Sequence, residues 1–317
     1  MRITLLAGGV GAARFLRGLM AEAPDAQLTV IGNTADDITL FGLHVCPDLD
    51  TVMYTLGGGI SEEQGWGRDG DTYSVLSELA AYGAGPDWFS LGDRDIATHI
   101  HRTSMLAAGL PLSSVTRVLC QRWQPGVELL PMSDDRVETH VVLPGQGEGE
   151  RTVHFQEWWV RMHAQVPAAA FVFAGAAEAT PAPGVIEAIE NADVVLFPPS
   201  NPVVSIGPVL AVPGIADAVR AKTVVGVSPI IGGAPVRGMA DACLAAIGVP
   251  ATAAGVAAHY GPELLAGWLV DDQDKQAADA PELAGIAVRA LPLYMTGVPA
   301  TAAIARAALA LAAELAR

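Results

Sequence analysis

The chain of 317 residues is 51% hydrophobic and 16% charged, which supplies a core for one large α/β domain or two modest ones and excludes a disordered chain. Its 18 basic and 34 acidic side chains leave a formal net charge of −16, which argues against sequence-independent binding of nucleic acid. A phosphorylated ligand would have to be bound locally, through backbone amides, a few arginines or a cation.

The cysteines and the apolar stretches indicate neither a disulfide-linked protein nor a membrane protein. Cys46, Cys120 and Cys243 are odd in number and form no CxxC pair, so we expect reduced thiols and a cytoplasmic protein. The N-terminus lacks the pattern of a signal peptide. Residues 300–316, the most apolar later stretch, are interrupted by two charges and predict a C-terminal helix packed on the core.

Short β-branched runs alternate with helical patterns, which is typical of an α/β fold with a mostly parallel sheet. The chain opens with a predicted strand over residues 3–7, a helix over residues 13–21 and a second strand over residues 28–31. The later predicted elements are helices over 185–190 and 215–221 and strands over 193–197, 223–227, 268–270 and 286–291.

The middle of the chain has a different pattern. Residues 137–143 and 151–155 alternate in polarity and are joined by the glycine-rich stretch 144–150, which predicts an antiparallel hairpin. We therefore predict a Rossmann-like, mostly parallel core built from residues 1–60 and 175–317, with a smaller α+β lobe inserted over residues 60–175.

A glycine-rich loop follows the first predicted strand and opens a helix. Gly8, Gly9 and Gly11 would let backbone N–H groups approach phosphate oxygens at the helix N-terminus. A dinucleotide fingerprint would need a small residue where Arg14 stands, and no Gly-Lys-Ser/Thr follows, so neither an NAD loop nor a Walker A loop is indicated. The loop predicts a phosphate site with Arg14 as an added ligand; a tight strand–helix turn with a solvated arginine is the simpler alternative.

Carboxylates follow the second strand and begin the next helix. Asp36 and Asp37 come after Asn33, at a strand end where ligands lie in open α/β sheets. Asp48 and Asp50 stand at a predicted helix start, and for Asp48 an ordinary capping role is the favoured interpretation. Carboxylates beside a phosphate loop repel the ligand unless a cation lies between them, so we expect Asp36 and Asp50 to share one Mg²⁺ with a diphosphate.

Polar turns also follow later strands. Ser200 and Asn201 lie in the proline-braced turn 198–208, and Ser228 opens the turn 228–233. Such turns can present hydroxyls and amides to a base or sugar, or merely end strands; with the glycine loop on the same sheet edge they favour a nucleotide cleft. A dense polar segment over residues 91–99 contains Asp93, Arg94 and His99, of which the histidine is more readily structural than metal-binding.

Taken in order, these motifs resemble the family of transferases that attach a phospholactyl-type group to a deazaflavin on the way to coenzyme F-420. The resemblance covers nearly the whole chain, through residues 8–14, 33–37, 47–54, 91–99, 131–135, 154–158, 200–208 and 228–232. The actinobacterial branch is the most similar, through residues 46–50, 54–59, 121–126 and 154–161.

The resemblance implies a guanosine diphosphate-linked donor of a phosphoenolpyruvyl group, or of a 2-phospho-L-lactyl group. It implies 7,8-didemethyl-8-hydroxy-5-deazariboflavin as the acceptor, GMP as the leaving group, Mg²⁺ as the cofactor and a homodimer with a Rossmann-like core. The inserted lobe is then expected to contribute to the deazaflavin site. The residues expected at the donor are Gly8, Gly9, Gly11, Arg14, Asn33, Ser200, Asn201 and Ser228.

The same resemblance implies residues for the acceptor and the metal. Asp50, Asp93 and Arg94 are expected near the deazaflavin, and Asp36 and Asp50 are expected both to hold Mg²⁺ and to act in catalysis. The nearest alternative is a regulatory nucleotide-sugar-binding protein of the same fold family, which residues 91–99 and 154–158 disfavour. An NAD-dependent oxidoreductase is disfavoured by Arg14 and by Asn33, which stands where an isolated acid would be needed.

Overall fold

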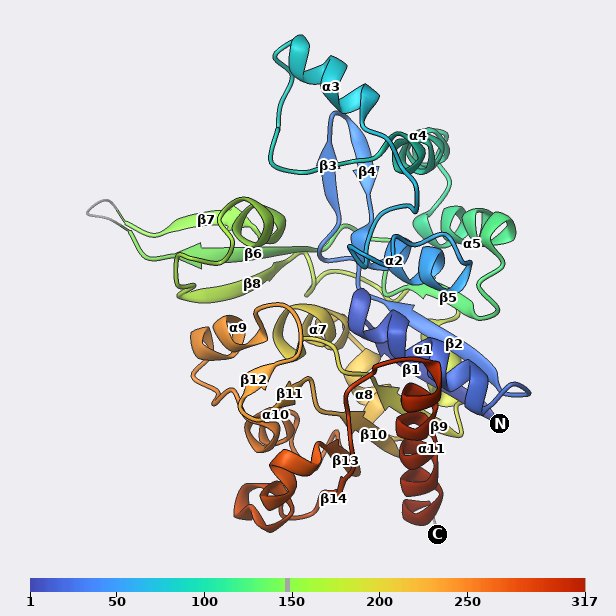
Figure 1. The fold of residues 1–317 in the computed structure, drawn as a ribbon, viewed down its shortest axis with the longest axis vertical. Helices are drawn as coiled ribbons and strands as arrows, with labels where there is room; N and C mark the ends of the chain where they lie inside the picture. The colour runs from blue at the N-terminus through green and yellow to red at the C-terminus, as the bar shows by residue number, and fades with distance from the viewer. Residues whose placement is uncertain (146–148, 317) are drawn as a thin grey trace.

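A seven-stranded sheet forms the centre of the computed structural model, which describes residues 1–145 and 149–316 (Figure 1). Its strands lie in the order β14-β13-β10-β9-β1-β2-β5, and every neighbouring pair is parallel. The predicted α/β class with a mostly parallel, Rossmann-like sheet is confirmed. The strands are β1 (Arg2–Ala7), β2 (Gln27–Gly32), β5 (Glu128–Pro131), β9 (Val194–Phe197), β10 (Val224–Val227), β13 (Gly267–Val270) and β14 (Ala287–Ala290).

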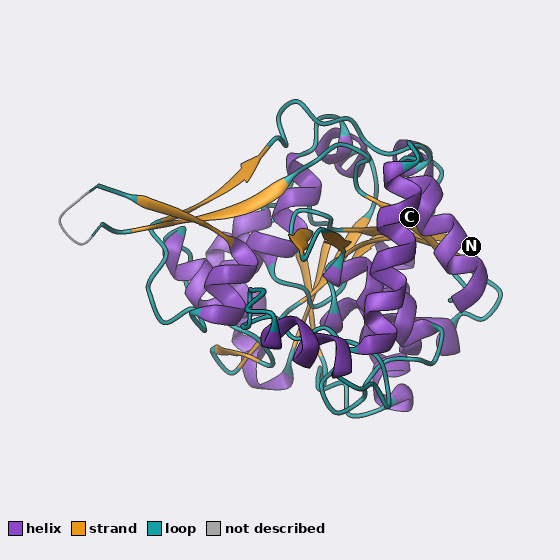
Figure 2. Ribbon diagram, turned by 90° about the horizontal axis from the view of Figure 1, so that it is seen from above, coloured by secondary structure: helices purple, strands orange, loops and turns teal. Residues whose placement is uncertain are grey.

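Helices cover both faces of this sheet, as Figure 2 shows from above. Strand residues alternate between the two faces, so Ile3 and Leu5 of β1 belong to one hydrophobic cluster and Leu6 to the other. The first cluster is completed by α1 (Val10–Glu22), α2 (Pro47–Leu56), α5 (Leu112–Trp123) and α11 (Val298–Leu315). The second is completed by α6 (Val185–Glu190), α7 (Gly207–Ala211), α8 (Ile215–Arg220), α9 (Ala240–Ala246) and α10 (Ala253–Tyr260).

Two smaller pieces extend from the sheet (Figure 1). The hairpin β3 (Ile38–Leu40) and β4 (Leu43–Val45) packs against α4 (Asp93–Ala107), which also contacts α3 (Ser74–Ala81). The predicted antiparallel hairpin is present as β6 (Glu138–Leu143) and β7 (Arg151–His154), and β8 (Ala170–Ala174) adds a third strand. Residues 146–148 of its predicted turn lie outside the described residues. The remaining short elements are η1 (Glu157–Arg161), η2 (Pro202–Ile206), β11 (Ile230–Ile231), β12 (Ala234–Pro235), η3 (Asp272–Asp279) and η4 (Pro281–Leu283).

Strand β5 lies inside the range 60–175 that the sequence assigned to an inserted lobe. It nevertheless pairs with β2 as an edge strand of the main sheet. The elements of that range outside the sheet therefore fall into two parts, one with α3, α4 and α5 before β5 and one with the antiparallel sheet after it. Only two consecutive apolar side chains, Leu129 and Leu130, mark β5 in the sequence, and that run is too short for a periodic signal.

The predicted C-terminal helix is α11, which packs against α1. By length and composition alone α11 is apolar enough to cross a membrane, but it buries Ile304, Ala305 and Ala308 in the hydrophobic cluster it shares with α1. This is the arrangement of a core helix. The contact is close because Gly18 of α1 faces Thr301 of α11, and a Cβ on Gly18 would lie 2.5 Å from the Thr301 backbone carbon.

We predict that Gly18→Ala destabilises the protein. Helix propensity alone would favour alanine by about 0.5–1 kcal/mol, but overpacking against the α11 backbone costs about 1–3 kcal/mol. Chemical denaturation should therefore give a lower free energy of unfolding than in the wild type. Ala21→Ser, at an exposed position of the same helix, is the control. Unchanged or increased stability of Gly18→Ala would contradict close packing of the two helices.

Candidate active site

The predicted site segments meet at the carboxyl ends of four neighbouring strands. The glycine loop follows β1, residues 33–37 follow β2, residues 198–206 follow β9 and residues 228–233 follow β10. The chain leaves β1 for β2 on one side, while β9 lies on the other, so the strand order reverses at β1. A crevice at such a switch point is the usual ligand site of an open α/β sheet.

The glycines of the loop allow it to approach its neighbours. A Cβ on Gly9 would lie 2.6 Å from Oδ1 of Asp48, and one on Gly11 would lie 2.3 Å from the backbone oxygen of Pro199. A Cβ on Gly8 would lie 2.5 Å from Oγ of Ser205. Larger residues would push the loop away from the start of α2 and from the turn after β9. The glycine loop therefore contacts both the start of α2 and the turn after β9 at the switch point.

Asn33 connects the same segments from the side of β2. Its fully buried side chain donates from Nδ2 to Oδ2 of Asp48 at 3.0 Å and to the backbone oxygen of Val204 at 3.3 Å. Its Oδ1 accepts from the backbone N–H of Ala35 at 3.0 Å. The amide predicted to face the guanosine is thus engaged within the protein, where it holds Asp48 against the turn after β9.

Three carboxylates crowd beside the loop. Asp36 and Asp37 are only 5% and 7% exposed, and Oδ1 of each is buried without a hydrogen-bond partner among the described residues. Burial, and after it the charge of Asp48, raises the pKa of Asp36 well above its usual range. Burial raises the pKa of half-buried Asp48 to about 7, although the hydrogen bond from Asn33 opposes the shift. Such a group holds protons at neutral pH or requires a compensating cation.

Asp50 belongs to a second, separate network. Arg102 donates to its Oδ1, and Nδ1 of His99 lies 3.7 Å from its Oδ2. His99 also approaches Asp95, with 3.4 Å between Nε2 and Oδ1, and the Tyr54 hydroxyl donates to that same oxygen at 2.8 Å. Although burial opposes it, these contacts with His99 and Tyr54 lower the pKa of Asp95. All five side chains are buried.

Two helices supply this network. Asp50 and Tyr54 are one turn apart on α2, and Asp95 and His99 are one turn apart on α4, so each pair lies on one helix face. Arg102 continues the α4 row at a spacing of three residues. The structural role expected for His99 agrees with this placement. Sequence reasoning missed Tyr54, Asp95 and Arg102; their spacing of three or four residues from Asp50 and His99 was the available signal, but no helix was predicted over the residues of α4.

The structure places the predicted acceptor residues apart from Asp50. Asp93 accepts from Oγ1 of Thr72 at 2.6 Å and from the backbone N–H groups of Ser74 and Val75 at the start of α3. The Thr72 hydrogen bond is the main cause that lowers the pKa of Asp93. Arg94 donates to the backbone oxygen of Asp69 at 3.0 Å. Neither has a hydrogen bond or ion pair with Asp50 in the part of the chain that the structure describes.

On the donor side, two of the predicted polar groups are used locally. Oδ1 of Asn201 accepts from the backbone N–H groups of Val203 and Val204 and so caps η2. Oγ of Ser228 donates to the backbone oxygen of Ile230 at 2.8 Å. Oγ of Ser200 is buried without a partner among the residues described, so it keeps its hydrogen-bonding capacity for a ligand.

Arg14, half-buried in the first turn of α1, has a cationic neighbour that the sequence did not reveal. Partial burial and, after it, the charge of Arg14 lower the pKa of Arg237. Arg237 donates to the backbone oxygen of Gln64, and its guanidinium lies 5.4 Å from the ring centre of Trp66, which is 54% exposed. Arg14 thus has a second positive charge, Arg237, in its electrostatic surroundings, with an exposed aromatic ring beside Arg237.

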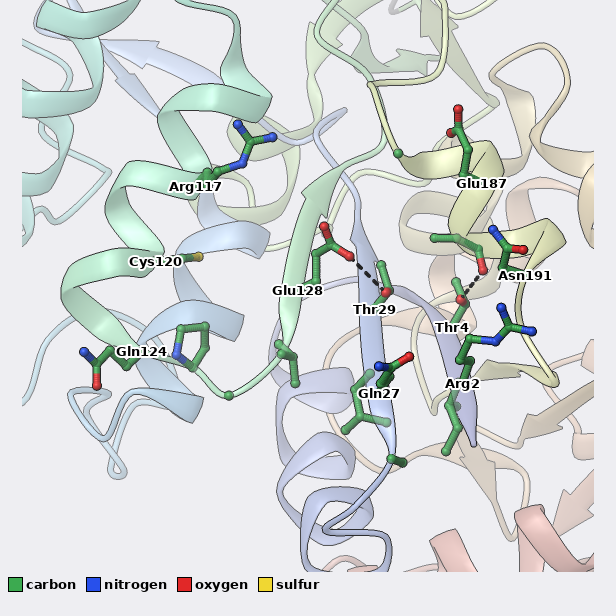
Figure 3. A pocket seen from close by; sticks show the side chains of 18 of the residues that line it. Arg2, Thr4, Gln27, Thr29, Arg117, Cys120, Gln124, Glu128, Glu187 and Asn191 are labelled. Atoms are coloured by element: carbon green, nitrogen blue, oxygen red, sulfur yellow. Dashed lines mark hydrogen bonds between the residues drawn. The ribbon is translucent and has the colours of Figure 1, made fainter.

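A hollow of about 870 Å³ lies at the amino ends of the strands, opposite the carboxyl ends that carry the predicted site segments (Figure 3). It is lined by Arg2, Gln27 and Glu128, which are the first residues of β1, β2 and β5. Thr29 donates to Glu128 at 3.3 Å within it, and basic and acidic side chains are mixed there without a cluster. None of the predicted site residues lines this hollow, so the carboxyl edge is the candidate active site.

The fold and this edge define a nucleotide-binding α/β protein with an acidic centre, and the comparisons identify its family. The chain belongs to the family described as 2-phospho-L-lactate transferase CofD, whose model matches residues 3–286. It is 65% identical to the phosphoenolpyruvate transferase of Thermobifida fusca and 67% identical to that of Streptomyces griseus, over 99% of each chain. It is 53% identical to the phosphoenolpyruvate transferase of Mycolicibacterium smegmatis, over 98% of this chain and 99% of the relative. The family and branch predicted from the motifs are confirmed.

A solved structure supports the fold. A member of the UPF0052 family from Bacillus halodurans is 17% identical, with a TM-score of 0.60, and the match covers 97% of this chain and 99% of that one. At this identity the similarity concerns the fold alone.

The carboxylates beside the loop generate a pH prediction. Because Asp48 has a pKa raised from 3.8 to about 7, the folded protein binds more protons than the unfolded chain between these values. In EDTA, the free energy of unfolding should therefore fall as the pH rises from about 4 to 7. Asp48→Asn, which keeps an acceptor for Asn33, should reduce this slope; exposed Asp25→Asn should not. Equal slopes in denaturation series of wild type and Asp48→Asn would refute the raised pKa.

Proposed function

We propose that this chain transfers a phosphoenolpyruvyl group from a guanosine diphosphate-linked donor to 7,8-didemethyl-8-hydroxy-5-deazariboflavin and releases GMP, a step of coenzyme F-420 biosynthesis. The observation that carries this proposal is the joining of the glycine loop, Arg14 and the buried carboxylates at the switch point of the sheet. The names of relatives that are 53–67% identical support the enolpyruvyl group over the lactyl group. They also disfavour the regulatory alternative.

The chemistry of the donor set fits a magnesium ion. Mg²⁺ prefers oxygen ligands and is commonly held by one or two carboxylates together with phosphate oxygens. Oδ1 of Asp36 is buried without a hydrogen-bond partner among the described residues, and burial, followed by the charges of neighbouring carboxylates, raises the pKa of both Asp36 and Asp48. When bound, the ion would supply neutralisation of the donor diphosphate and of the charge that develops during transfer.

Contacts favour Asp36 with Asp48 as the pair that holds this ion. The sequence predicted Asp36 with Asp50, because Asp48 was interpreted as a helix cap. Asp48 lies against Gly9 and is half-buried, whereas Asp50 faces two basic side chains: its Oδ1 accepts from Arg102, and its Oδ2, which has no hydrogen bond among the described residues, lies 3.7 Å from His99. Asp50 stays the predicted catalytic residue near the deazaflavin acceptor. Arg102 and His99 contact its two carboxylate oxygens and would hold them in position.

The remaining residues bind and orient the donor. Arg14 and the backbone N–H groups of the glycine loop would bind its phosphates, since no side chain caps the N-terminus of α1. Arg237 would add a positive charge near Arg14, and the Ser200 hydroxyl, which has no partner among the described residues, would be available to the guanosine. The predicted homodimer and cytoplasmic location stay predictions.

Direct assay of the purified protein tests the proposed reaction. With Mg²⁺, the deazariboflavin and the enolpyruvyl donor, we expect GMP and the coupled product to appear in equal amounts, with a lower rate for the lactyl donor. Reactions without acceptor are the control for donor hydrolysis. If no GMP is released while a nucleotide sugar binds tightly without turnover, the regulatory function replaces the transferase.

Isosteric variants test the metal pair. Asp36→Asn and Asp48→Asn should each weaken Mg²⁺ binding in calorimetry by about tenfold or more, because each removes a charged ligand. Asp50→Asn should bind Mg²⁺ as the wild type does and lose GMP release instead. Exposed Asp25→Asn is the matched control. Loss of Mg²⁺ binding in Asp50→Asn, with normal binding in Asp48→Asn, would establish Asp36 and Asp50 as the pair.

A further inference from the structure

Three arginines surround an open hollow of about 410 Å³ at the C-terminal end of α2. Arg68, Arg94 and Arg122 line it together with Trp123 and the glycine turn 57–59. Five of its lining residues, 57–59, 122 and 123, belong to two of the stretches that resemble the actinobacterial branch. The proposed donor site uses neither stretch.

These arginines are not neutralised. The chain has 34 acidic side chains and only 18 basic ones. An arginine on the surface of such a chain therefore has many carboxylates with which it could form an ion pair. Yet over residues 1–145 and 149–316 none of the three lies within 4.0 Å of a carboxylate oxygen. Asp69 also lines the hollow, but Arg94 bonds to its backbone oxygen. The three arginines outnumber the one lining carboxylate, Asp69, so the hollow carries net positive charge.

An aromatic platform holds two of these charges in place. The guanidinium carbons of Arg68 and Arg122 lie 4.3 Å and 4.5 Å from the ring centre of Trp123. The glycine turn packs closely against the same ring: a Cβ on Gly57 would lie 2.8 Å from a ring atom of Trp123, and a Cβ on Gly59 would lie 2.3 Å from one. A guanidinium stacked on a ring keeps its N–H groups available in the plane, where they can bind an oxyanion.

Arg68 and Arg122 lie close together, and this arrangement of like charges favours binding of an anion between them. Nε of Arg68 is buried without a hydrogen-bond acceptor in the described part of the chain. Burial lowers the pKa of Arg68, and the charge of Arg122 lowers it further. We propose that this hollow binds a small polyanion through phosphate or carboxylate oxygens shared by Arg68, Arg94 and Arg122.

This site is separate from the proposed donor site. Asp48 and Asp50 lie in the first turn of α2, and Gly57 follows its last residue. The seven residues from Asp50 to Gly57 span roughly 10 Å along a helix. The buried side chains of Tyr54 and Asp95 occupy part of the space between the two ends. The proposal thus goes beyond the proposed transfer reaction, and it assigns Arg94 to the polyanion in place of the deazaflavin.

Binding of inorganic pyrophosphate to the full chain tests this site. Titrations are made in EDTA, which removes the cation that the proposed donor site would need to hold a diphosphate, and at low ionic strength. We expect one site, weakened about tenfold or more in the double variant Arg68→Gln/Arg122→Gln, because charge-assisted hydrogen bonds are lost. Arg117→Gln, an exposed arginine of the same helix α5, is the matched control and should bind as the wild type does.

Other outcomes would overturn the proposal. These are absence of pyrophosphate binding, unchanged binding in the double variant, loss of binding in Arg14→Gln, or competition by the deazariboflavin. Arg122→Lys keeps the charge and guards against misfolding of the double variant; it should retain part of the affinity. Pyrophosphate should also raise the melting temperature of the wild type above that in chloride at equal ionic strength. GMP release is measured separately without pyrophosphate, so failure of the transfer reaction and of this site are distinguishable.

Discussion

The close approach of the glycine loop to the start of α2 is the steric constraint on which the candidate site depends. The Asp48 carboxylate occupies the space into which a side chain on Gly9 would project, and the turn after β9 does the same at Gly11. Strand β1 lies in the interior of the sheet and pairs with β9 on one side and β2 on the other, so the start of its loop is held in place by both neighbours. Any residue larger than glycine would separate the loop from the acids, and the crevice would lose its phosphate side or its cation side.

Electrostatics then divide the acids of this edge into two kinds. Asp50 is compensated by a guanidinium of the protein, because Arg102 of α4 donates to its Oδ1. Among the described residues neither Asp36 nor Asp48 has an ion pair with a basic side chain, and burial raises the pKa of both. A buried carboxylate that is left uncompensated costs stability, so its retention at a strand end favours a function over a structural role.

Prediction from the sequence succeeded where a signal extends over many residues and failed where it depends on one contact. The strands over 3–7 and 193–197 are runs of apolar residues at α/β spacing, and both are present. β5 has only two such residues, and its pairing with β2 is set by the sheet. Asp48 and Asp50 share one helix turn, so no pattern could tell which would meet Asn33 and which Arg102.

Helix α2 finally relates the two charged sites to each other. Its first turn holds Asp48 and Asp50, where acidic groups interact favourably with the helix dipole. Its own last turn has no basic residue, but Arg17 donates to the backbone oxygen of Thr55, and Arg68 and Arg122 stand beside the turn that follows. Other segments thus supply the positive charge that the C-terminal end of a helix favours. Helix α2 therefore has acidic side chains at its first turn and arginines of other segments at its last, which places the proposed cation site and the proposed polyanion site at opposite ends of one short helix.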